Sequence, residues 1–486
     1  MLLRLNSKSE SRNPKQIQNS NDQNIKCLLR LDGGFCFENL YFGHSILFRI
    51  SDFVLRSLVP KQGFSVLHRA VVLSTCLLVV TWTSSAPAFE LWSDPDGRRT
   101  DLDVAVKWTS LTSHPPDDPL LYPPGTTWTE LARLRLGLTS QHSDRLSTQI
   151  AYEQAFRWQS KAGTVAGGVL PPTADVPFRI KPLQWHVTDP SAQQLHEHEI
   201  DRLLAAYHAD WGAITVGRQA LGLGRGVVFS ALDLFVPFSP LDVDREWRRG
   251  VDALRIERRV TDTSSVELLG VFGETWEQSA LLARARGYVA AWDADLIFGK
   301  RADDTLIGTS LSAPWGGAEV HGEVTYFHTP EAQPDGGAFG RSHWAIKAVA
   351  GTSYTFNWRN GVTVLGEFHY NGLGVRDIAA SAAQIADPQF VTRLLRGDMQ
   401  ILSQQALAVQ VSHPLGLTLS TGLLVLQSPT DGSGLLAPSL VWDIGDTGRI
   451  LTSVYVPWGD EPKGGLLQSE YGGTPLSLFV QGAWDR

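Results

Sequence analysis

Cysteine is nearly absent from this 486-residue sequence. The three cysteines are Cys27, Cys36 and Cys76, and none follows Cys76. Disulfides, cysteine metal sites and haem attachment through a CxxCH motif are therefore excluded from most of the chain. P-loop, HExxH and GxSxG motifs are missing as well. The sequence predicts a protein that is not an enzyme and needs no cofactor or metal, although an enzyme carried on an outer-membrane barrel remains a weaker alternative.

Long apolar runs are also missing. The most apolar segment, residues 66–88, has His68 and Arg69 first, then an apolar run, then Ala86-Pro87-Ala88. This order is typical of a secretory signal peptide, and the run is shorter than the roughly 20 residues of a spanning helix. We interpret 1–65 as a doubtful N-terminal extension, which a wrong start codon would explain, and 66–88 as the signal peptide. A genuine extension and a buried core helix are the respective alternatives.

Lysine is scarce after residue 88. Residues 89–486 contain 32 Lys or Arg, only six of them Lys, against 45 Asp or Glu. A net acidic chain without a basic stripe argues against binding to nucleic acid. Arginine dominates the cations, and its guanidinium offers a fixed charge and several donors for carboxylates or phosphates.

Alternation with a period of two is the main pattern that the sequence contains. In AEVHGEVTYFH (residues 318–328), Val320, Val324 and Tyr326 share one strand face, and Glu319 and Glu323 share the other. Such a strand fits a soluble sandwich with a wet polar face. It fits equally a membrane barrel whose apolar face meets lipid and whose polar face lines a lumen.

The connections between strands favour the barrel. Short turns and longer connections mostly alternate along the chain, as in outer-membrane barrels with short periplasmic turns and long outer loops. The predicted fold is all-β, a transmembrane antiparallel up-and-down barrel of about 18 strands (16–18) formed by residues 89–486. The strands are expected at 102–112, 128–140, 145–156, 198–210, 213–224, 250–260, 264–275, 280–290, 293–301, 304–313, 318–328, 343–356, 360–371, 400–413, 416–427, 434–444, 449–457 and 474–484.

The charged strand faces are expected to point into the lumen, because Lys or Arg on the lipid face costs about 2–4 kcal/mol at mid-bilayer. One strand resists this pattern: in 213–224, Arg218 shares a face with Ile214 and Val216, which requires a bulge or a packed arginine. The predicted pore-lining residues are Arg133, Arg135, Arg218, Arg225, Arg284, Arg286, Glu319, His321, Glu323 and Glu367.

The segment 214–257 has the highest density of charge, and an apolar run lies between its charges. A wholly exposed loop rarely holds that much apolar content. We therefore expect residues 225–249 to fold into the barrel mouth as a constriction, where charged side chains select solutes. An outer loop held down by ion pairs is the alternative. The predicted constriction residues are Asp233, Asp242, Asp244, Arg245, Glu246, Arg248 and Arg249.

At this segment the chain resembles outer-membrane porins of the alginate-export type. The resemblance rests on TVGRQALGLGRG, then Asp233 and Pro237, then DREWRRG, and covers mainly residues 213–257. It implies an eighteen-stranded barrel with an arginine-lined pore for an anionic polysaccharide, with Arg218 and Arg225 as pore arginines. The net acidic chain departs from that pattern.

These patterns predict an outer-membrane channel of a Gram-negative bacterium for passive diffusion of hydrophilic solutes or oligosaccharides, anionic ones included. A non-conducting barrel that serves as sheath or scaffold of an envelope complex is the alternative. The expected partners are outer-membrane lipid, the barrel-assembly machinery and small solutes, whereas the sequence leaves the oligomeric state open. Residues 372–399 are expected to hold a helix that Pro388 interrupts and that caps the pore or packs on its rim.

Overall fold

The computed structural model describes residues 89–161, 169–170, 176–188, 193–242, 244–330 and 343–485. The predicted N-terminal extension and signal peptide lie outside the described residues. Within them, no helix has the length and apolar character that crossing a membrane requires.

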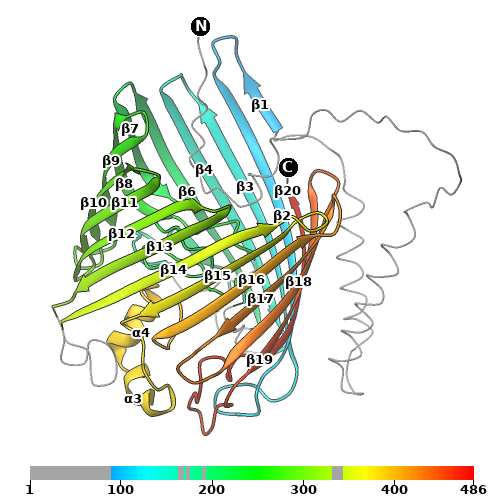
Figure 1. Ribbon diagram of the computed structural model, residues 1–486. Coiled ribbons are helices and arrows are strands. Elements are labelled where there is room, and N and C mark those ends of the chain that lie inside the picture. Colours follow the sequence, from blue (N-terminus) through cyan, green and yellow to red (C-terminus); the bar gives the residue numbers. More distant parts are fainter. Residues whose placement is uncertain are drawn as a thin grey trace, which may run out of the picture. The chain divides into compact units, whose positions relative to one another are not determined.

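Twenty antiparallel strands dominate the fold (Figure 1). They are β1 (Phe89–Ser93), β2 (Arg99–His114), β3 (Thr127–Gln141), β4 (Leu146–Gln159), β5 (Gln184–His186), β6 (Gln194–Ala209), β7 (Gly212–Gln219), β8 (Val251–Thr261), β9 (Ser264–Phe272), β10 (Ala280–Val289), β11 (Trp292–Arg301), β12 (Asp304–Trp315), β13 (Ala318–His328), β14 (Trp344–Phe356), β15 (Val362–Asn371), β16 (Gln405–Pro414), β17 (Leu419–Gln427), β18 (Gly434–Ile444), β19 (Gly448–Trp458) and β20 (Leu476–Asp485).

Eighteen of these strands close into a barrel. Each of β2, β3, β4 and β6 to β20 pairs with the next, and β20 pairs with β2 from Ala105↔Asp485 to His114↔Leu476. β1 extends the sheet beside the start of β2, and β5 pairs with β6 over three residues. The predicted closed antiparallel barrel of about 18 strands is confirmed, and every expected strand overlaps an observed one. The two largest differences in bounds are five residues each: β7 ends at Gln219 instead of 224, and β16 begins at Gln405 instead of 400.

The two ends of the barrel differ in their connections. At one end, strands join through turns of two to five residues, and β2 begins and β20 ends there. The turn at Gly316 and Gly317 needs only two residues, since both glycines adopt positive φ (56° and 86°), as a tight hairpin requires. We call this end the turn end. The opposite end, the loop end, holds the long connections 220–250 and 372–404.

The connection 372–404 forms helices at the loop end (Figure 1). A 3₁₀ turn, η2 (Ala379–Ser381), leads into α3 (Ala382–Ile385), and α4 (Pro388–Leu395) follows. Pro388 begins α4 and the carboxylate of Asp387 accepts the Gln389 N–H, so the predicted interruption is a second helix start.

The barrel wall has an apolar exposed face and a polar buried face. On β13, Val324 and Tyr326 are 46% and 39% exposed, whereas Glu323 and Thr325 between them are at most 1% exposed. Exposed Trp and Tyr side chains also gather near the turn end, at Tyr207, Trp211, Tyr288, Trp292, Trp315, Tyr354 and Trp358. An apolar outer band with an aromatic girdle is the surface that a bilayer covers.

Candidate functional site: the barrel interior and the inner loop

The connection between β7 and β8, residues 220–250, packs against the inside of the wall. We call it the inner loop. Its Leu232 and Phe235 are at most 1% exposed and share one hydrophobic cluster with Val271, Leu282 and Ile297 of β9, β10 and β11. These wall positions alternate with exposed apolar residues of the same strands. The cluster therefore lies on the inward face, and the inner loop lies within the barrel.

Two wall carboxylates hold the inner loop by its backbone. Glu323 accepts the N–H groups of Gly226 (2.7 Å) and of residues 231 and 232 (2.6 and 3.0 Å), and also the Ser230 hydroxyl (2.7 Å). Glu367 accepts the N–H groups of residues 227, 228 and 229 at 2.6, 2.9 and 3.0 Å. Because residues 226–232 belong to no strand, these carboxylates satisfy backbone donors that burial would otherwise leave unpaired.

Glycine is required where the loop turns around these carboxylates. A Cβ on Gly226 would lie 1.8 Å from the Phe229 carbonyl oxygen, and one on Gly224 would lie 2.0 Å from Ser230 Oγ. The glycines of the GLGRG stretch thus permit the close approach of the chain to itself. His321 completes the arrangement, with its Nε2 3.0 Å from Glu367 Oε1.

One ionic network connects β2, β3 and β4 to the second half of the inner loop. Lys107 binds Asp244 at 2.7 Å and Glu246 at 2.6 Å. Arg133 and Arg135 of β3 both contact Glu153, at 2.6 and 3.3 Å. Trp247 lies against the three cations, with Lys107 Nζ 4.0 Å and the Arg133 and Arg135 guanidinium carbons 4.6 and 5.3 Å from its ring centroid.

A second network lies around Asp295 of β11. Arg225 of the inner loop binds Asp293 at 2.8 Å and Asp295 at 2.6 Å. Arg284 and Arg286 of β10 reach the same Asp295 at 2.9 and 3.1 Å. The charge of each arginine is thus balanced locally. Arg286 keeps the most contact with solvent, with 38% of its side chain exposed.

Arg218 is packed against other groups of the protein. A packed arginine was one of the two alternatives, beside a bulge, that the pattern of strand 213–224 required. Its side chain is 2% exposed, and its Nε donates to Asp252 at 2.8 Å. Its NH1 donates to the carbonyl oxygens of Pro182 (2.6 Å) and Ile200 (3.0 Å). It therefore offers no free charge to a solute, unlike the pore-lining position that the sequence predicted.

The remaining predicted residues of the inner loop pair mainly with one another. Arg248 binds Asp233 at 2.7 Å, and Arg245 donates to the backbone oxygens of Asp242 and Pro240, both at 3.2 Å. Burial raises the pKa of the Asp242 carboxyl to about 7, although the N–H of Ser239 and the charge of Arg245 oppose that shift. Arg249 reaches Glu199 of β6 at 3.3 Å. Glu319, on the face of β13 that carries Glu323, is exposed.

The sequence reasoning missed most of the carboxylates that balance these cations. Asp293 and Asp295 alternate on β11 as Glu319 and Glu323 do on β13, so the same period-two pattern was available to find them. Lys107 and Trp247 gave no such signal, because their roles depend on the path of the inner loop. Among the described residues, no group of three or more His, Cys, Asp or Glu side chains is arranged to hold a metal ion.

Comparison with known proteins shows that the chain resembles solved porin structures in its barrel fold. No protein-family model and no curated protein matches the chain. Among solved structures, OmpF of Salmonella typhi in complex with daunomycin is 12% identical over 82% of this chain and 100% of that one, with a TM-score of 0.44.

Two further porin-like structures are similar to the same extent. OccAB4 of Acinetobacter baumannii is 11% identical over 81% of this chain and 100% of that chain, with a TM-score of 0.47. A BenF-like porin from Pseudomonas fluorescens Pf-5 is 10% identical over 80% of this chain and 98% of that chain, also with a TM-score of 0.47. Values this low carry no functional argument, and the closed barrel rests on the register of its own strands.

Proposed function

We propose that residues 89–486 form an outer-membrane channel for passive diffusion of hydrophilic solutes, with the inner loop as its constriction. The observation that carries this proposal is the closed 18-strand wall, whose outer face is apolar and whose charged inner face holds the inner loop. The aromatic girdle would position the barrel in the bilayer, with the turn end in the periplasm and the loop end outside.

The proposed mechanism is diffusion past ion-paired walls. The two networks, around Trp247 and around Asp295, both include residues of the inner loop and of the wall strands. Fixed dipoles and paired charges in a confined space orient a polar solute without trapping it by a strong net charge. We infer a modest ion preference rather than the strong anion preference of an unpaired arginine ladder.

Any preference for anionic solutes is assigned to Arg286. Its side chain is 38% exposed, whereas those of the other five predicted pore arginines are at most 16% exposed. An anionic polysaccharide of the alginate type, which the resemblance implies, is the anionic substrate that we propose. The predicted interaction with the barrel-assembly machinery likewise stays a proposal.

The test is the single-channel conductance and reversal potential of the refolded 89–486 chain in a planar bilayer. Steady current steps support the channel, and the reversal potential in a salt gradient gives its ion preference. A folded barrel that gives no current would contradict the proposal and favour a scaffold. The inner loop argues against a scaffold that threads a partner, since the loop occupies space inside the barrel that such a partner needs.

A further inference from the structure

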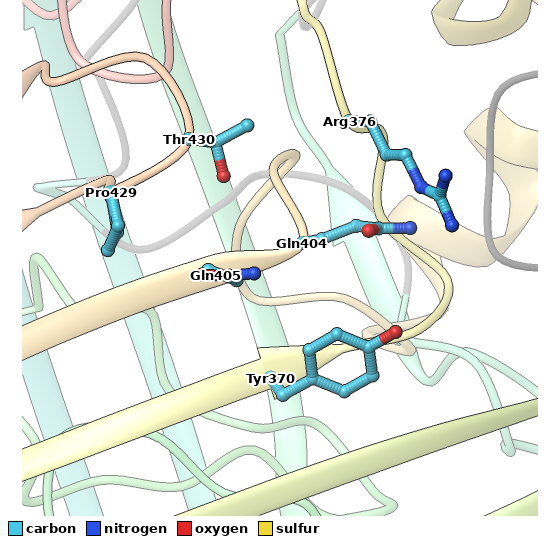
Figure 2. Close-up of a pocket in the computed structure, with 6 residues that line it drawn as sticks. All are labelled: Tyr370, Arg376, Gln404, Gln405, Pro429 and Thr430. Atoms are coloured by element: carbon cyan, nitrogen blue, oxygen red, sulfur yellow. The ribbon is translucent and has the colours of Figure 1, made fainter.

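A cavity of about 430 Å³ lies at the loop end between three connected parts of the wall. Figure 2 shows its lining, which comes from the ends of β15 and β16, from the connection 372–404 and from the turn between β17 and β18. The lining residues are Tyr370, Arg376, Gln404, Gln405, Pro429 and Thr430.

The cavity opens on the outward side of the barrel. Tyr370 and Gln405 are directly paired between β15 and β16. They share their strand faces with Phe368 and Leu407, which are exposed, whereas Glu367 on the opposite face binds the inner loop. A molecule in this cavity therefore sits above an apolar strip of the barrel wall and not in the lumen.

Most polar side chains that line the cavity have no partner among the residues that the structure describes. Among the described residues, the guanidinium of Arg376, the hydroxyls of Tyr370 and Thr430, and the side-chain amide of Gln405 make no hydrogen bond or ion pair. The buried Gln404 donates its amide to the Gly374 carbonyl oxygen at 3.3 Å. The arginines of the barrel interior differ, since carboxylates balance every one predicted to line the pore.

We propose that this cavity binds the phosphate-bearing headgroup of an anionic lipid. A guanidinium and several hydroxyl and amide donors match the oxygens of a phosphate ester. The exposed Phe368, Leu407 and Val409 continue down the same outward face and would contact the acyl chains. Free phosphate would use the donors but leave this apolar strip uncovered, so the site as a whole fits an amphiphile.

The inference rests on the membrane placement in the proposed function but not on conduction, because a barrel that passes no current still presents this face to lipid. Lipid binding and conductance are therefore measured separately. A loss of lipid binding with normal current rejects only the lipid site, and retained lipid binding without current rejects only the channel.

The test is native mass spectrometry of the refolded 89–486 chain, released from detergent that contains either phosphatidylglycerol or the zwitterionic phosphatidylcholine. We expect phosphatidylglycerol to remain bound and Arg376→Gln to reduce its retention roughly tenfold, the change that loss of one charge-assisted hydrogen bond produces. Arg359→Gln is the matched control. It removes an arginine at the other end of β15, where Arg359 stacks on Trp358 with 5.1 Å between guanidinium carbon and ring centroid.

Three results would overturn the proposal. They are equal retention by Arg376→Gln and the unmodified chain, equal losses in Arg376→Gln and Arg359→Gln, and equal retention of phosphatidylcholine. Inorganic phosphate is added as competitor, and its displacement of the lipid at equal concentration would reassign the cavity to free phosphate. Heat-modifiable migration on gels confirms that each variant is folded before its lipid content is compared.

Discussion

The two long connections of the loop end satisfy their backbone hydrogen bonds in different ways. The described residues of the inner loop form no helix or strand, and wall carboxylates receive backbone N–H groups of its first half, among them those of residues 226 to 229. The connection 372–404 instead forms η2, α3 and α4 and buries a cluster of its own, with Phe390 1% exposed. A segment without regular hydrogen bonding can enter a barrel only if the wall provides the missing partners.

The two regions also differ in how their arginines are ion-paired. Every predicted pore arginine is balanced by an acidic side chain of the wall or the neighbouring strand. In the connection 372–404, Arg393, Arg396 and Asp398 form a comparable buried cluster with Arg301 and Asp304. The guanidinium of Arg376 has no ion pair or hydrogen bond with any residue that the structure describes. Paired charges thus fix the conformation, whereas Arg376, which has no partner in the described part of the chain, is the charge that the proposed lipid site uses.

The largest effect is expected when both anchors of the inner loop are neutralised. Glu323→Gln with Glu367→Gln replaces charge-assisted hydrogen bonds by weaker ones. We expect more than about 3 kcal/mol of lost loop stability, a change of over 100-fold in local opening. Trypsin would then cleave within 225–249, at arginines such as Arg245 and Arg248, and mass spectrometry would identify the fragments. Glu319→Gln, on the same face of β13, is the control.

An inner loop that resists trypsin equally well in the double variant and in the control would show that packing alone holds it. Reduced cleavage in the double variant would contradict the anchoring role more strongly.

The second effect concerns the connection 372–404. Asp398→Asn leaves Arg301, Arg393 and Arg396 without their shared carboxylate, in a cluster where the Arg301 side chain is 1% exposed. Removing one partner of a buried ion pair costs about 3–5 kcal/mol. Urea unfolding of the barrel in liposomes measures this loss.

The matched control is Asp443→Asn, which breaks an ion pair with Arg449 whose two side chains are 35% and 46% exposed. Exposed pairs contribute less than about 1 kcal/mol. Equal losses in the two variants would mean that the cluster around Asp398 is not buried as described.

A pH dependence is expected from Asp242 of the inner loop. Burial raises its pKa from 3.8 to about 7, so the folded loop binds this proton more tightly than the unfolded chain does. The stabilising contribution is complete below pH 4 and is lost as the pH rises towards 7 and beyond. Between pH 5.5 and 8.5, the added negative charge should shift the reversal potential towards cations, and Asp242→Asn should abolish that part of the shift. A full shift in Asp242→Asn would assign the titration to another group.

The smallest effect distinguishes an exposed arginine from a packed one. Arg286→Ala should lower the anion-to-cation permeability ratio by an amount equivalent to less than about 1 kcal/mol, as expected for a partly exposed charge. Arg218→Ala should leave the ratio unchanged and lower stability, because Arg218 binds Asp252 and backbone carbonyl oxygens. A change in permeability for Arg218→Ala alone would contradict this assignment.

The wall of the barrel was predictable from the sequence because period-two alternation and turn length are local signals. The expected strand 318–328 is β13 to the residue. The end of β7 was not predictable, because 220–224 continue the apolar alternation but already belong to the inner loop, where Leu221 and Leu223 cluster with Phe235. Propensity alone does not separate a strand from an extended chain that hydrogen-bonds to distant side chains.

The sequence predicted which side chains face the barrel interior better than it predicted which groups they bind there. Glu323 and Glu367 were expected on the inward face, but nothing local to either residue indicates that it receives backbone N–H groups about 90 and 140 positions away. The balance of arginines by Asp295 and Glu153 was missed for the same reason. Such pairings depend on the closed barrel and on the path of the inner loop within it.

The most direct test of the inner loop as the constriction uses the absence of cysteine after Cys76. Val227→Cys in the refolded 89–486 chain introduces one thiol into the inner loop, at a residue that is 38% exposed. A bulky thiol reagent added to an open channel should reduce its current in discrete steps. Leu417→Cys, in a fully exposed turn at the turn end, should react without changing the current. Complete modification of Val227→Cys with unchanged current would show that solutes do not pass the inner loop.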